Sequence, residues 1–204
     1  MFNARREPLE PTYHEYQSRA LPLISKLLTQ REKAVVVDLG PASGSKVDFL
    51  SAFRCKVFIE NFHDSLVSYR EESSDGSNAD SLFHELLFFQ HRSLVDIVLC
   101  WDLLNYLSPE EFGEFLRRLS LRISPGAVVL THLASSDMLS ETPGCYSIVD
   151  GIRIGVEYPA NSRISQCVRF SHLDFCRALP GATLECSVLL TNGLKEQSFI
   201  CLSQ

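Results

Sequence analysis

Residues 34–44 read AVVVDLGPASG, an apolar run with three consecutive valines that ends in a turn of Gly, Pro and Ser. An uninterrupted run of this kind suits a strand that is buried on both faces, as in a parallel sheet. A glycine-containing turn lets the backbone come close to a ligand, and the helix that follows offers free N–H groups. The stretch therefore predicts an α/β fold whose first turn borders a binding site.

The segments that follow alternate between strand-like and helix-like patterns. Strands are predicted at residues 56–60, 95–100 and 127–131. The helix between the last two begins at Ser108-Pro109, an N-cap serine with proline at the first helical position, and ends before the turn at 124–126. Strands that alternate with helices of this length indicate right-handed βαβ units and a parallel sheet.

The N-terminal part and one internal segment carry other patterns. Thr12 and Glu15 have the spacing of a helix capping box, and apolar residues at helical spacing continue to Leu28. Residues 1–33 are therefore predicted to form a helical cap. Residues 71–78 are small, polar and turn-prone, so we expect an exposed loop within the domain.

The last third of the sequence predicts a different arrangement. Residues 135–165 look loop-rich, and a short helix is expected near residues 172–179. Two strands are expected at 183–190 and 197–202. They flank Asn192-Gly193, which is a strong hairpin signal. The sheet is therefore predicted to finish in an antiparallel hairpin.

These features resemble the class I S-adenosylmethionine-dependent methyltransferase family. The family pattern after the first strand is acidic-x-Gly-x-Gly-x-Gly. Asp38, Gly40 and Gly44 match it, while Ala42 replaces the middle glycine. Glu60 follows Gly40 by 20 residues, at the end of the predicted second strand, where the family keeps an acidic residue.

The resemblance covers residues 34–134 and implies a Rossmann-like, mostly parallel sheet flanked by helices. Residues 96–107 look like the family's fourth strand with its cofactor-facing segment, and residues 123–127 look like the turn before its fifth strand. One domain is implied, in which 34–134 is the cofactor-binding core. The N-terminal cap precedes this core, and 135–204 forms the acceptor-side loop and the hairpin.

The resemblance also implies S-adenosylmethionine as the cofactor and a set of residues that hold it. In the family the glycine turn meets the methionine part, and the carboxylate corresponding to Glu60 accepts hydrogen bonds from the ribose hydroxyls. Asp38 would lie near the ammonium and sulfonium groups. The implied cofactor-binding residues are Asp38, Gly40, Pro41, Ala42, Gly44, Glu60, Asn61, Trp101 and Asp102. The alternatives are a turn former at Asp38, a solvated strand end at Glu60, a core aromatic at Trp101 and a helix cap at Asp102.

The candidate catalytic base is His132. It follows the predicted strand at 127–131, at the edge where ligands bind in open α/β sheets. Methyl transfer needs no base where alignment of nucleophile and methyl group supplies the rate. Residues 13–16 would form either a lid over the cofactor or part of an amphipathic helix. His84 and His91 are seven residues apart with no other ligand type beside them, so no metal site is predicted.

Composition limits the location and the partners. The chain has 204 residues and a net charge of −6, which fits one globular domain and disfavours a nucleic acid partner. Its seven cysteines contain no Cys-x-x-Cys pair and are predicted to be buried reduced thiols, which suits a cytoplasmic protein. Residues 1–8 resemble no secretory signal, and no apolar run approaches the roughly 20 residues of a membrane span.

Two hypotheses for the function remain open. The first is a methyltransferase acting on an oxygen or nitrogen of a small molecule or a protein side chain, with a homodimer left open. The second is a non-catalytic binding or scaffold protein with the same fold. It is motivated by Ala42 and by residues 79–90, which look helical where the family has a strand and an adenine-contacting acid. A nicotinamide-dependent oxidoreductase is disfavoured, because Gly-x-Gly-x-x-Gly matches at Gly40 alone.

Overall fold

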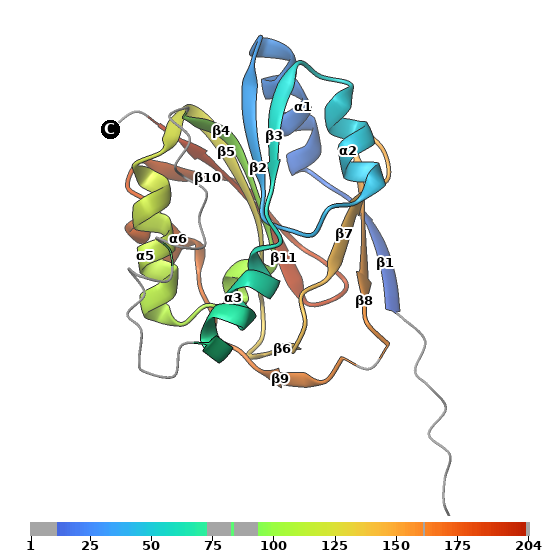
Figure 1. Cartoon of the computed structure of the whole chain (residues 1–204), viewed down its shortest axis with the longest axis vertical. Coiled ribbons are helices and arrows are strands. Elements are labelled where there is room, and N and C mark those ends of the chain that lie inside the picture. Colours follow the sequence, from blue (N-terminus) through green and yellow to red (C-terminus); the bar gives the residue numbers. More distant parts are fainter. Residues whose placement is uncertain (1–11, 73–82, 84–93, 161, 203–204) are drawn as a thin grey trace, which may run out of the picture.

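The computed structural model describes residues 12–72, 83, 94–160 and 162–202. Its centre is a sheet of six strands: β2 (Ala34–Asp38), β3 (Cys55–Ile59), β4 (Val95–Trp101), β5 (Ile123–Ala134), β10 (Ala182–Leu189) and β11 (Leu194–Cys201). The strands lie in the order β10-β11-β5-β4-β2-β3 (Figure 1). Strands β2, β3, β4 and β5 run parallel, whereas β11 is antiparallel to both β5 and β10. The predicted α/β sheet with an antiparallel C-terminal hairpin is confirmed.

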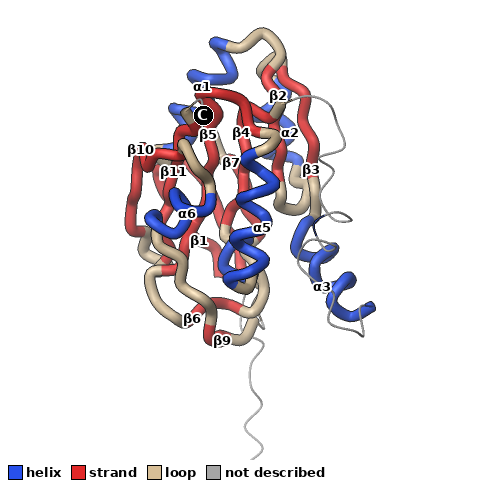
Figure 2. Tube along the Cα trace, turned by 90° about the vertical axis from the view of Figure 1, so that its left-hand side faces the viewer, coloured by secondary structure: helices blue, strands red, loops and turns tan. Residues whose placement is uncertain are grey.

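Helices cover both faces of this sheet (Figures 1 and 2). One face carries α1 (Ala20–Gln30) and α2 (Gly44–Ser51), and the other carries α3 (Phe62–Glu72), α5 (Pro109–Ser120) and α6 (His172–Ala178). Strand β4 is buried along its whole length. Its side chains alternate between two apolar clusters: Ile97 and Leu99 face α1, whereas Val98 and Cys100 face α5. This double burial explains why the strand has no polar alternation.

Helix α5 begins where its sequence signals predict. The Ser108 hydroxyl accepts a hydrogen bond from the N–H of Glu111 at 3.2 Å, and the Glu111 carboxylate accepts one from the N–H of Ser108 at 2.7 Å. This reciprocal pair is a capping box. The helix delivers the chain to Gly126, whose φ of 76° lets the backbone turn within β5.

A second, smaller sheet packs beside α2 and was not predicted. Its strands are β1 (Thr12–Gln17), β7 (Cys145–Ile148) and β8 (Arg153–Tyr158), paired antiparallel in the order β1-β8-β7. A two-stranded ribbon of β6 (Met138–Ser140) and β9 (Ile164–Gln166) lies next to it (Figure 1). The predictions of a helix after Pro11 and of a loop over 135–165 are therefore wrong. The helix begins only at Ala20. Residues 12–17 form a strand that pairs with β8, far along the chain.

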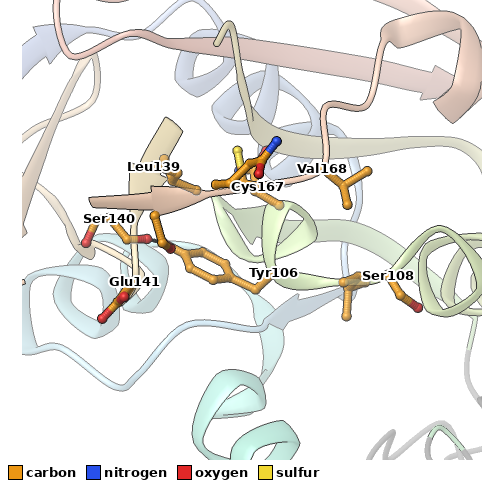
Figure 3. Close-up of a pocket in the computed structure, with 11 residues that line it drawn as sticks. Tyr106, Ser108, Leu139, Ser140, Glu141, Cys167 and Val168 are labelled. Atoms are coloured by element: carbon orange, nitrogen blue, oxygen red, sulfur yellow. Dashed lines mark hydrogen bonds between the residues drawn. The ribbon is translucent and has the colours of Figure 1, made fainter. Parts of the chain in front are cut away.

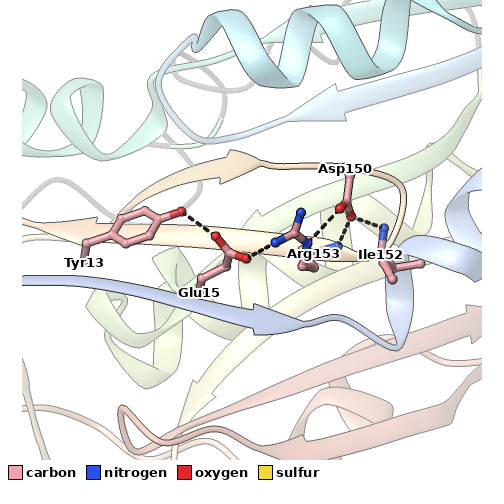
Figure 4. Close-up of polar contacts among 5 residues, drawn as sticks. All are labelled: Tyr13, Glu15, Asp150, Ile152 and Arg153. Atoms are coloured by element: carbon pink, nitrogen blue, oxygen red, sulfur yellow. Dashed lines mark hydrogen bonds and ion pairs between the residues drawn. The ribbon is translucent and has the colours of Figure 1, made fainter.

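Ionic and aromatic side chains fasten β1 to β8 (Figure 4). Arg153 donates to Glu15 at 2.6 Å and to Asp150 at 2.7 Å, and the Tyr13 hydroxyl donates to Glu15 at 3.3 Å. Gly155 lies under Tyr13, and a Cβ there would come within 2.3 Å of the Tyr13 hydroxyl oxygen. Glu15 thus serves a cross-strand ion pair instead of the predicted capping box.

Other predictions have mixed outcomes. Only Cys100 and Cys201 are buried as predicted. Four other cysteines are half-buried, and Cys145, at the start of β7 beside an open cleft, is exposed. Most of the predicted loop at 71–78, and all of the segment 79–90 except Phe83, lie outside the described residues. No helix in the described part of the chain is long and apolar enough to cross a bilayer.

Candidate functional site

The turn after β2 and the segment after β3 meet at the carboxyl edge of the parallel strands. Asp38, the last residue of β2, is the parallel partner of Ile59. Its carbonyl oxygen accepts a hydrogen bond from the N–H of Glu60 at 2.7 Å. Glu60 is half-buried, and burial raises the pKa of its carboxyl. The glycine turn and the predicted ribose-binding segment therefore share one edge of the sheet, where open α/β folds bind ligands.

The turn itself is shaped by contact at one glycine and not at the other. Ser43 caps α2 by accepting a hydrogen bond from the N–H of Lys46. A Cβ on Gly40 would lie 2.8 Å from the Trp101 ring, whereas a Cβ on Gly44 would meet nothing within 4 Å. Ala42 is exposed, so its methyl group faces solvent at the position of the family's middle glycine.

A buried ion pair lies directly behind this turn. The ammonium of Lys46 is 2.7 Å from the Asp38 carboxylate, and both side chains have no exposed surface. The other Asp38 oxygen accepts hydrogen bonds from the Trp101 indole at 2.6 Å and from the N–H of Gly40 at 3.0 Å. Desolvation raises the pKa of Asp38, and Lys46 and these donors oppose that effect. Asp38 is therefore fully engaged by neighbours within the chain.

Trp101 forms the wall between this pair and the small sheet. It has φ = 52°, the one positive φ outside glycine among the described residues. A bulky residue in this region is strained by about 1–3 kcal/mol, and such strain concentrates at functional sites. Its ring lies 4.8 Å from that of Tyr146 on β7, with an interplanar angle of 18°. The small sheet therefore packs onto the edge where the site was predicted.

His132, the candidate base, is enclosed behind Trp101. It is completely buried, stacks on Tyr146 with ring centroids 4.9 Å apart, and shares a short hydrogen bond between Nε2 and the Tyr16 hydroxyl. Burial lowers the pKa of His132 to about 3, which keeps the imidazole neutral. Residue 16 thus covers the edge of the central sheet, but from a strand and not from a helix.

Asp102 is the buried carboxylate that does reach the cleft. Its Oδ2 accepts hydrogen bonds from the N–H of Gly144 at 3.0 Å and from the Tyr158 hydroxyl at 3.4 Å. Its Oδ1 is buried and has no hydrogen-bond partner among the described residues. Burial raises the pKa of Asp102 to about 7, so this carboxyl titrates near neutral pH.

A cleft of about 200 Å³ lies at this edge of the sheet. Its lining is Gly40, Pro41, Asn61, His63, Asp64, Trp101, Asp102, Leu103, Thr142, Pro143, Gly144, Cys145 and Pro159. The predicted residues are therefore only partly brought together here. Ala42, Gly44 and Glu60 lie outside the lining, and Asp38 and His132 are buried behind it.

The lining also includes residues that sequence reasoning missed. Asp64 accepts a short hydrogen bond from Asn61, which was predicted, and the unpredicted His63 lies beside them with its pKa lowered by burial. The spacing of Asn61 and Asp64, at the start of a helix, was an available signal. Residues 142–145 carried no such signal, because they come from the stretch that matched nothing.

Two further cavities flank the β6–β9 ribbon. One, of about 320 Å³, lies between the ribbon and the short helix η1 (Leu103–Tyr106) (Figure 3). There the Tyr106 hydroxyl donates to the carbonyl oxygen of Ser140 at 3.0 Å. The other, of about 330 Å³, is bordered by His14 and Tyr158 and shares Pro159 with the cleft. The second cavity and the cleft therefore adjoin the same residue, Pro159.

Comparisons with known proteins show similarity of fold to methyltransferases and no similarity of sequence. No protein-family model matches the chain, and no curated protein sequence matches it. An amino pentose methyltransferase from Micromonospora echinaspora, solved with S-adenosylmethionine bound, superposes with a TM-score of 0.50 at 12% identity over 89% of both chains. S-adenosylmethionine-dependent methyltransferases from Clostridium acetobutylicum (TM-score 0.52, 10% identity, 89% and 90% coverage) and Methanosarcina mazei (0.52, 14%, 90% and 98%) are also similar.

Proposed function

We propose, from its class I methyltransferase fold, that this chain binds S-adenosylmethionine and transfers its methyl group to a small-molecule or protein acceptor. The observation that carries the proposal is one cleft at the carboxyl edge of the parallel strands, lined jointly by Gly40, Asn61 and Trp101-Asp102. Ligands of open α/β sheets bind at this edge. The bound cofactor supplies an activated methyl group, and the protein supplies binding and alignment.

The cleft suits the nucleoside half of the cofactor. Pockets for drug-sized ligands enclose roughly 300–1,000 Å³, so a cleft of about 200 Å³ has room for part of such a molecule. The amide of Asn61 both donates and accepts hydrogen bonds, and the Asp64 carboxylate accepts them. These groups match the hydroxyls of a ribose and the nitrogens of a purine. Glu60 adjoins them and would join the ribose contact after a side-chain rotation.

The amino-acid half of the cofactor does not fit the arrangement described. Trp101 and Lys46 occupy the space against Gly40, and the Asp38 carboxylate already has a cation. The tail of the cofactor would have to displace both side chains.

The acceptor side is formed by residues 142–145 and Pro159 opposite the turn. Asp102 is the group suited to take a proton from an acceptor amine or hydroxyl, because it lines the cleft and titrates near pH 7. This replaces His132, which is neutral but lies behind Trp101. The neighbouring cavity beside Tyr158 offers room for the remainder of an acceptor.

The packing of Trp101 and Lys46 against Gly40 also favours a second candidate, a binding protein without catalysis. Calorimetric titration with S-adenosylmethionine and S-adenosylhomocysteine tests both functions. The methyltransferase proposal expects binding of both ligands and a loss of affinity of about tenfold in Asn61→Ala, with the exposed Lys33→Ala as the control. Absence of binding by either ligand would leave the non-catalytic protein as the better account.

A further inference from the structure

The Lys46–Asp38 pair has features that are costly for a fold. Lys46 lies in the first turn of α2, where the helix dipole disfavours a cation, and that turn contains no acidic residue. Its ammonium is completely buried, as is the carboxylate of Asp38. Burying two charges costs desolvation that their attraction only partly recovers. Stability alone therefore gives little reason for this pair to exist.

Trp101 packs against both Lys46 and Asp38, and the three side chains together form one closed unit. Its indole donates to Asp38 at 2.6 Å, and the Lys46 ammonium lies 5.2 Å from the centre of its ring. Its positive φ of 52° stores backbone strain that an alternative conformation would release. The two side chains are thus held by one carboxylate, and displacing either one loosens the other.

The unit fills the space against the turn. An atom placed where a Cβ of Gly40 would stand is 2.8 Å from the Trp101 ring and 3.2 Å from the Lys46 ammonium. No ligand atom fits there while both side chains remain. The cleft that Trp101 lines together with Asn61, His63 and Asp64 stays open, with a volume of about 200 Å³.

We propose that Lys46 is an internal substitute for the charged tail of an adenosyl ligand and determines which adenosyl ligand the cleft accepts. With Lys46 on Asp38, the cleft accepts a nucleoside without an amino-acid tail, such as adenosine. A tail that carries an ammonium group competes with Lys46 for Asp38 and has to displace Trp101 as well. This inference rests on one part of the proposed function, that the cleft takes adenosyl ligands. A methyl donor with an amino-acid tail enters only by displacing Lys46 and Trp101.

The test compares adenosine with S-adenosylhomocysteine in the full chain and in Lys46→Met. Trp101 is the sole tryptophan of the chain, so its emission reports binding at this wall, and calorimetry gives the dissociation constants. In the unaltered chain we expect S-adenosylhomocysteine to bind no more tightly than adenosine. In Lys46→Met we expect its affinity to rise by about tenfold or more. Adenosine affinity should stay within about threefold, and Lys33→Met, an exposed lysine, should change neither.

Lys46→Met leaves a buried carboxylate without a cation and can fail to fold for that reason. The double variant Lys46→Met with Asp38→Asn removes both charges and keeps acceptors for Trp101 and Gly40. In it S-adenosylhomocysteine should gain affinity relative to adenosine, but less than in Lys46→Met, because the tail finds space and no countercharge.

The two proposals fail in different ways. If both ligands bind and their affinity ratio is the same in the unaltered chain and in both variants, the role of Lys46 is overturned and the adenosyl site stands. If S-adenosylhomocysteine binds the unaltered chain much more tightly than adenosine, the role of Lys46 is likewise overturned. If neither ligand binds any of the three proteins, the adenosyl site itself is wrong.

Discussion

The carboxylate of Asp102 accepts a hydrogen bond from the backbone N–H of Gly144, with 3.0 Å between the nitrogen and Oδ2. This contact joins the end of β4 to the segment that leads into β7, and so fixes the small sheet over the cleft. It also withdraws Asp102 from water. The carboxyl keeps its proton up to a pH of about 7, because burial penalises the charged form.

Asp102 should make the protein less stable as pH rises toward neutrality. The folded chain binds this proton up to about pH 7, whereas an unfolded chain releases it near pH 4. Between these values the folded state holds more protons, so the free energy of unfolding falls by at most about 1.4 kcal/mol per pH unit. Urea unfolding across this range should show the decline in the unaltered chain and a flatter profile in Asp102→Asn. If the stability of Asp102→Asn declined with pH as steeply as that of the exposed control Asp137→Asn, the assignment to Asp102 would be contradicted.

Gly40 and Gly44 should respond oppositely to the same substitution. A Cβ at Gly40 would press on the Trp101 ring, so Gly40→Ala should destabilise the fold by about 1–3 kcal/mol and shift the Trp101 emission. Gly44→Ala meets no atom within 4 Å and should be neutral or stabilising by up to about 1 kcal/mol, since alanine favours the helix. Denaturant unfolding followed by tryptophan fluorescence measures both. Equal losses in the two variants would argue against close packing at Gly40.

Gly155 should be required for the attachment of the N-terminal strand. In Gly155→Ala the new methyl group displaces the Tyr13 hydroxyl, which breaks its bond to Glu15 and costs about 1 kcal/mol, because the ring end can swing aside. Amide hydrogen exchange should then accelerate over residues 12–17 more than over β4. Gly151→Ala has open space at its Cβ and is the matched control. Unchanged protection of β1 in Gly155→Ala would show that the packing of Tyr13 on Gly155 does not stabilise the attachment of this strand.

Cys145 should be the most reactive of the described cysteines. It is exposed at the rim of the cleft, whereas Cys100 and Cys201 are buried. A thiol reagent added to the native protein should modify it first, with the site identified by mass spectrometry. Saturating adenosine should slow that modification, and the fast phase should disappear in Cys145→Ser. Labelling that ignores adenosine would mean that the nucleoside binds elsewhere.

The central sheet was predictable because its signals are local. The apolar run of β2, the capping box at Ser108 and the Asn192-Gly193 turn each act within a few residues of sequence. The small sheet depends on β1 meeting β8, where Glu15 and Arg153 are 138 residues apart. No local pattern reports such a pairing, and the Thr12 and Glu15 spacing pointed to a helix instead.

Sequence reasoning found the edge that carries the candidate site but not its interior. Asp38 and Trp101 were both expected to face a ligand, and they face each other. Lys46 was overlooked, because a lysine in the first turn of a helix ordinarily extends into solvent. It is buried here because Asp38 lies opposite it, which only the folded chain reveals. His132 lies at the expected strand end, but Tyr16 and Tyr146 of the unforeseen small sheet enclose it.

The pairing of β1 with β8 also has a consequence for how the chain is made. At about 5–20 residues per second, a ribosome needs about 7–28 s to synthesise the 138 residues between Glu15 and Arg153. During that interval the nascent N-terminal strand has no partner, and an unpaired strand edge invites contact with other chains. The wall of Tyr16 and Tyr146 over His132 therefore assembles late in biosynthesis, and a chaperone that shields residues 12–17 should raise the yield of folded protein.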